Sequence, residues 1–159
     1  MPRQSRIDAS GALHHVIIWV IERTLIFRDD RDRDNFLDRL GGLLLESSTP
    51  FYAWSLLCNH THFLLRRGKI PIAVVMKKLL TGYAVTFNRR YGPHGHLFQK
   101  RYESILCDEG VYLVELVRYI HLNALCAGGS RAAIYVKPNY TGTKPTALVK
   151  KIGIKRFLD

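Results

Sequence analysis

Two histidines, His60 and His62, stand one residue apart at the start of an apolar stretch. Successive side chains of a β-strand point to opposite faces, so the two imidazoles would lie on the same face. Imidazole is the commonest protein ligand for metal ions. The spacing therefore predicts part of a divalent-metal site, although an isolated His-x-His pair also occurs often by chance.

About sixty residues later in the chain, a tyrosine and an asparagine supply groups that such a site needs. Tyr119 and Asn123 are spaced i, i+4, so they share one face of a helix. The amide oxygen of Asn123 is a hard donor that suits Mg²⁺ or Mn²⁺ as a third protein ligand. A phenol is a weak nucleophile at neutral pH, but a nearby cation favours the phenolate of Tyr119. Together these residues predict metal-assisted attack on a phosphodiester.

Two neighbours in the same stretch compete for these roles. Tyr112 lies about two helical turns before Tyr119 and faces a similar direction, but it has no amide at i+4. We therefore rank it second as the nucleophile. Glu115 would be a secondary metal contact, although a solvated helix charge is the more common role. A tyrosine on an amphipathic helix is also more often a packing residue than a nucleophile.

The charge of the chain indicates its class of partner. Its 24 Lys and Arg against 13 Asp and Glu give a net charge of +11 in 159 residues. Such an excess is typical of proteins that bind nucleic acid or an acidic membrane surface. No apolar run reaches the roughly 18 residues of a transmembrane helix, and no signal peptide is recognisable. We expect a cytoplasmic protein that binds nucleic acid and does not associate with a membrane.

Hydrophobic periodicity predicts the elements that position these residues. The expected strands cover residues 13–21, 51–57, 60–66 and 101–107, and the expected helices cover residues 29–46, 72–90 and 108–123. The order β-α-β-β-α-β-α predicts an α+β fold of the ferredoxin-like (RRM-like) type. In this fold an antiparallel sheet is flanked by helices, and here a C-terminal helix would carry Tyr119.

The chain is expected to form one domain over residues 1–129, followed by a basic C-terminal tail over residues 130–159. The tail has seven basic residues and one acid. It is either a solvated terminus or an arm that contacts phosphates.

Mixed aromatic and basic residues predict a surface for unpaired nucleotides. Lys100, Arg101 and Tyr102 combine two cations with a ring that can stack on a base. Arg89 and Arg90 would extend this surface, although basic residues at a helix end are also commonly just solvated.

Several motifs, taken in order, resemble one known family. They are Asn59-His60-Thr61-His62, Tyr83-Ala84 with Phe87-Asn88-Arg89-Arg90, Gly95-His96-Leu97-Phe98-Gln99 with Arg101-Tyr102-Glu103-Ser104, and Arg118-Tyr119-Ile120-His121-Leu122-Asn123. They look like the IS200-like single-tyrosine HUH transposases, and most of all like the REP-associated tyrosine transposases. The resemblance runs from Pro2 to about Gly128. Its N-terminal part adds Arg3 and Arg6 to the expected DNA-binding residues.

The resemblance implies a transposase that cleaves and rejoins single-stranded DNA, often beside a hairpin, through a covalent 5′-phosphotyrosine intermediate. It implies His60, His62 and Asn123 as ligands of Mg²⁺ or Mn²⁺, with Tyr119 as the nucleophile. It also implies a homodimer in the bacterial cytoplasm, at the nucleoid.

Some positions depart from the family pattern, and two alternatives therefore stay open. Thr61 replaces a bulky hydrophobic residue, and the family's Met-Pro, Arg-Gly and Asn-Pro pairs are replaced by Leu57-Cys58, Trp19-Val20 and Asn123-Ala124. One alternative is a non-catalytic DNA- or RNA-binding protein derived from this family. The other is a metal-dependent hydrolase that activates water at His60 and His62.

Overall fold

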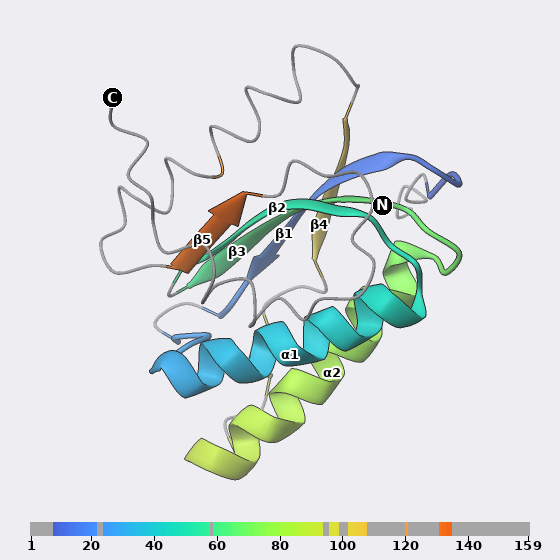
Figure 1. The fold of residues 1–159 in the computed structure, drawn as a ribbon. Coiled ribbons are helices and arrows are strands. Elements are labelled where there is room, and N and C mark those ends of the chain that lie inside the picture. The colour runs from blue at the N-terminus through green and yellow to red at the C-terminus, as the bar shows by residue number, and fades with distance from the viewer. Residues whose placement is uncertain are drawn as a thin grey trace, which may run out of the picture.

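The computed structural model describes residues 8–21, 24–57, 59–93, 96–98, 102–107, 120 and 131–134. This part of the chain contains five strands and two helices (Figure 1). In chain order they are β1 (Leu13–Trp19), α1 (Asp30–Glu46), β2 (Phe51–Leu56), β3 (His60–Arg66), α2 (Ile72–Tyr91), β4 (Glu103–Cys107) and β5 (Arg131–Ile134). Up to residue 107 these bounds agree with the sequence-based prediction to within two residues.

The five strands form one antiparallel sheet in the order β4-β1-β3-β2-β5. The first four strands and the two helices follow the split βαβ order, so the predicted α+β class with an antiparallel sheet is confirmed. β5 lies within the expected C-terminal tail, where it adds an edge strand beside β2. The domain boundary after residue 129 stays a prediction, and so does the C-terminal helix, of which only Ile120 is described.

Both described helices cover the same face of the sheet (Figure 1). They turn apolar stripes towards it because their hydrophobic residues recur every three or four positions. The largest members of the resulting core are at most 1 % exposed, and they include Phe27, Phe36, Phe51, Trp54, Phe63, Tyr83 and Phe87. No helix in the described ranges combines the length and hydrophobicity that crossing a bilayer requires.

An ion-pair cluster joins the start of α1 to the end of α2. Asp29 caps α1 by accepting a hydrogen bond from the backbone N–H of Asp32 at 3.0 Å. The buried carboxylate of Asp32 accepts bonds from the Arg28 backbone N–H at 2.9 Å, the Tyr91 hydroxyl at 2.6 Å and the Arg90 guanidinium at 2.6 Å. Arg90 also pairs with Asp29, and this hydrogen bond lowers the pKa of Asp29 to about 2.

We expect Asp32→Ala to lower the free energy of unfolding by about 1–3 kcal/mol, because it leaves the Arg28 N–H and the Tyr91 hydroxyl without their acceptor. Urea unfolding measures this loss. Asp30→Ala is the matched control, since Asp30 lies in the same first turn but its side chain is 67 % exposed. It should cost less than about 1 kcal/mol. Equal losses in the two variants would contradict a special role for Asp32.

The opposite face of the sheet carries a second, smaller cluster of buried residues, formed by Leu13, Ala53, Leu64, Cys107 and Ile120. Ile120 is helical and fully buried there. This residue of the expected C-terminal helix therefore packs against the sheet face that the two described helices leave free.

Candidate active site

The two histidines of the His-x-His pair lie on β3 and share the face of the sheet opposite α1 and α2. Their rings are 4.9 Å apart between centroids and nearly perpendicular, at 80°. Thr61 points the other way and is fully buried, as strand alternation predicts. We call the face that bears His60 and His62 the histidine face.

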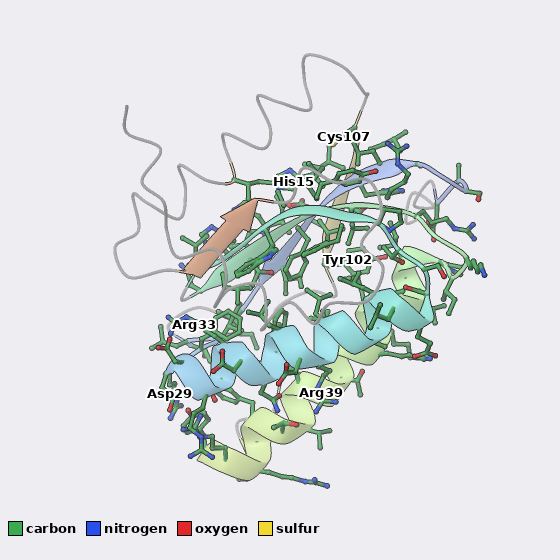
Figure 2. The ribbon with its side chains drawn as sticks, viewed as in Figure 1. His15, Asp29, Arg33, Arg39, Tyr102 and Cys107 are labelled. Carbon is green, nitrogen blue, oxygen red and sulfur yellow. The ribbon has the colours of Figure 1, made fainter. Side chains whose placement is uncertain are left out.

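A third histidine, His15 of β1, reaches the same place. Its Nε2 lies 3.0 Å from Nδ1 of His62, and the two rings stack with centroids 5.2 Å apart. Figure 2 shows His15 on the side of the sheet away from the helices. Because Nδ1 of His62 is bonded to His15, a metal ion held by His62 would bind at Nε2. The Nδ1–H of His62 would then donate to His15, which fixes the tautomer of both rings.

His60 is oriented by two contacts of its own. Its Nδ1 lies 2.7 Å from Oδ1 of Asn59, so Nε2 is again the nitrogen that would bind a metal. Its ring stacks on the indole of Trp19, with centroids 4.5 Å apart and an interplanar angle of 19°. Trp19 is the direct partner of His60 across the β1–β3 ladder. The Asn59 contact also fixes a tautomer, as metal-binding histidines require.

Burial favours the neutral form of these rings. Burial lowers the pKa of His62 to about 3, with smaller contributions from the neighbouring His15 and His60. Burial also lowers the pKa of His15 and of His60. Neutral imidazole is the form that binds a metal ion, so both proposed ligands are held in the competent state.

The residues of this face fit a divalent cation as an incomplete ligand set. Two imidazoles, each with Nδ1 already bonded, provide the donors. Ser55 of β2 lies opposite His62 and is fully buried. Its hydroxyl has no hydrogen-bond partner among the described residues, so it is a further unsatisfied polar group on this face. Within the described ranges no three His, Cys, Asp or Glu side chains are grouped to hold a metal. A third ligand must therefore be of another type or come from elsewhere in the chain.

Ile120 indicates where the third ligand and the nucleophile would come from. It packs in the cluster that contains Leu64, which is the partner of His15 across the β1–β3 ladder. Ile120 therefore meets the sheet on the histidine face. Tyr119 and Asn123 themselves lie outside the described residues. So do the alternatives Tyr112 and Glu115.

The residues predicted to bind DNA fall in different places. Arg89 is exposed on α2, away from the histidine face. Arg90 is on α2 as well, but its guanidinium is engaged by Asp29 and Asp32. Tyr102 is 6 % exposed and packs in the core beneath the sheet, which leaves its ring little surface for base stacking (Figure 2). The other four lie outside the described residues: Arg3, Arg6, Lys100 and Arg101.

The family model described as "Transposase IS200 like" matches residues 9–123 of this chain. The chain belongs to the IS200-like transposases. The family predicted from the ordered motifs is therefore confirmed. A comparison with curated proteins finds no match for this transposase.

Two solved structures share the fold of this transposase. The REP-associated tyrosine transposase bound to a REP hairpin superimposes with a TM-score of 0.65 at 14 % identity, over 80 % of this chain and 75 % of that one. A proposed transposase from Deinococcus radiodurans R1 gives a TM-score of 0.50 at 16 % identity, over 76 % of this chain and 96 % of that one. At these identities the likeness concerns the fold alone.

Sequence reasoning missed two residues of this candidate site, His15 and Trp19. Both lie on β1 and point to the same face of the sheet. His15 contacts His62, and Trp19 stacks on His60. A histidine and a tryptophan in a strand predicted to be buried were the sequence features that could have indicated a role for these residues. The sequence does not show that β1 pairs with β3, so it does not identify the residues that they contact.

Proposed function

We propose that this transposase is a metal-dependent DNA strand transferase with Tyr119 as its nucleophile. One observation carries the proposal. His60 and His62 present neutral, oriented imidazoles on the sheet face against which Ile120, the neighbour of Tyr119 in sequence, is buried. Metal ligands and a phenol brought together there would provide the groups that phosphodiester transesterification needs.

Each step of the reaction forms one phosphorus–oxygen bond and breaks one. The Tyr119 hydroxyl loses its proton, and its oxygen attacks the phosphorus of a phosphodiester. The bond from phosphorus to the 3′-oxygen breaks, and that oxygen takes up a proton to leave a 3′-hydroxyl. The 5′-phosphate stays joined to Tyr119, so the same exchange in reverse with another 3′-hydroxyl rejoins the strand without an external energy source.

His60 and His62 would hold the divalent cation, with Asn123 as the proposed third ligand. Mg²⁺ or Mn²⁺ bound there would polarise a phosphoryl oxygen and favour the Tyr119 phenolate. His15 and Asn59 orient the two imidazoles through their Nδ1 atoms. Asn123 adds an amide oxygen, which is a donor that these hard cations accept.

We propose single-stranded or hairpin DNA as the substrate. The net charge of +11 favours a polyanion. The structural neighbour with a TM-score of 0.65 is bound to a REP hairpin, which is a folded single strand. With such a substrate the protein would work at the bacterial nucleoid. Assembly into a homodimer remains part of the proposal, on the strength of the family resemblance alone.

A denaturing gel with end-labelled hairpin DNA tests the proposal. Incubation with Mn²⁺ or Mg²⁺ should produce a protease-sensitive band in which labelled DNA is covalently joined to protein, and EDTA should abolish it. Cut strands without a protein-bound band would instead support hydrolysis by activated water. Salt-sensitive binding without cleavage in any metal would support a non-catalytic nucleic-acid-binding protein.

We expect His15→Phe to raise the Mn²⁺ concentration needed for half-maximal cleavage by about 10–100-fold, because it removes the acceptor of the His62 Nδ1–H. His15→Gln retains an acceptor and should recover part of the loss. The matched control is His14→Phe. His14 is the adjacent buried histidine, but it bonds Ser104 rather than a metal ligand. An unchanged metal response in His15→Phe would contradict the orienting role.

A further inference from the structure

We propose that Trp19 is a nucleobase-stacking subsite beside the metal ligands. It would hold the base of a nucleotide next to the phosphate that is cut. The proposal rests on the function proposed above, since it assigns to the same site a contact with unpaired bases. It adds a group that recognises the base, whereas the histidines and Tyr119 act on the phosphate.

The position of Trp19 follows from the β1–β3 ladder. Trp19 is the last residue of β1 and lies directly opposite His60, so both side chains leave the sheet on the histidine face. The indole and the imidazole stack at 4.5 Å between centroids and 19° between planes. This contact places the indole against a proposed metal ligand and holds it in a defined plane.

Exposure separates Trp19 from the other tryptophan of the chain. Trp54 is 1 % exposed in the core, whereas Trp19 keeps 41 % of its surface open. A large aromatic ring in contact with solvent and beside a catalytic group is a surface on which a ligand ring can stack. Because the indole is already stacked on His60, it loses little further conformational entropy when a ligand binds, which favours binding.

The charge and the proposed chemistry select a nucleobase as the occupant. A chain of net charge +11 attracts the phosphate backbone, and phosphate contacts alone leave unpaired bases without a partner. Indole stacks on the π-face of any base, so a single ring accepts all four bases with modest preference. Because His60 would hold the metal that contacts the cleaved phosphate, a base on Trp19 belongs to a nucleotide next to that phosphate.

Intrinsic fluorescence of the intact chain tests the proposal directly, because the chain contains only two tryptophans. Titration is carried out in EDTA, so that binding is measured without cleavage. The probes are an oligothymidylate and an abasic deoxyribose-phosphate oligomer of equal length and charge. We expect the oligothymidylate to quench the emission of Trp19 and the abasic oligomer to leave it nearly unchanged. Equal quenching by both oligomers would overturn the proposal.

Substitutions provide the second readout. Trp19→Leu should weaken binding of the oligothymidylate by about 5- to 150-fold and leave binding of the abasic oligomer unchanged. Trp19→Phe retains a ring and should lie between. Leu45→Ala is the matched control, because Leu45 is also 41 % exposed but lies on α1, on the opposite side of the sheet. Wild-type affinity of Trp19→Leu for the oligothymidylate would overturn the proposal.

The two proposals fail in different measurements. Loss of the covalent adduct on the denaturing gel, with Trp19 still quenched by the oligothymidylate, would leave the stacking subsite standing in a non-catalytic binder. An adduct that forms while Trp19 is unaffected by bases would retain the transferase and remove the subsite.

Discussion

Tyr119→Phe is expected to eliminate the covalent DNA–protein adduct while leaving DNA binding close to wild type. The substitution removes only the hydroxyl oxygen that would form the bond to phosphorus, and the aromatic ring stays. We expect the rate of adduct formation to fall by at least about 1,000-fold, which is typical when a nucleophile is removed. The denaturing gel with labelled hairpin DNA and Mn²⁺ measures the adduct, and fluorescence titration in EDTA measures binding.

Tyr112→Phe is the matched control for this experiment, because the two tyrosines are seven residues apart and would face similar directions on the predicted helix. It should form the adduct at the wild-type rate. If Tyr119→Phe formed the adduct and Tyr112→Phe did not, Tyr112 would be the nucleophile. Peptide mapping of the labelled adduct identifies the modified residue independently of either variant.

His60→Ala and His62→Ala are each expected to abolish metal-dependent cleavage at Mn²⁺ concentrations that saturate the wild type. Each removes one of three proposed ligands, so the affinity for the cation should fall by well over about 10-fold. His60 is partly exposed, and its loss should have little effect on folding. His62 is 2 % exposed, so its replacement also leaves a cavity and lowers stability.

Cleavage measured against Mn²⁺ concentration, together with urea unfolding, separates these two effects. Thr61→Val is the matched control. Thr61 stands between the two histidines but faces the helices, and its hydroxyl has no hydrogen-bond partner in the described part of the chain. Valine has nearly the same shape, so this variant should cleave normally and be at least as stable. Cleavage by His60→Ala at the wild-type rate would remove that histidine from the site.

The sequence by itself determined the helices and strands up to residue 107 and the direction of the key histidines. Both depend on local rules. An apolar stripe at helical spacing marks α1 and α2, and alternation along a strand places His60 and His62 on one face with Thr61 on the other. The family also followed from the sequence, because its motifs occur in order along the chain.

The tertiary structure decided which residues accompany that pair. His15 and His62 are 47 residues apart, and only the register of β1 against β3 brings them to 3.0 Å. The same register stacks Trp19 on His60. The packing of α1 against α2 also pairs Arg90 with Asp32, which the sequence did not indicate. The predicted role of Arg90 in DNA binding stays a prediction.

Tyr102 illustrates the physical reason for this division. A basic-aromatic segment indicates a surface that binds nucleotides, but the face on which its ring lies depends on where β4 begins, and this strand begins at the next residue, Glu103. A shift of one residue along a strand exchanges the two faces of the sheet. Side-chain alternation is a local property that the sequence displays, whereas strand pairing joins distant residues through backbone groups that are the same for nearly every amino acid.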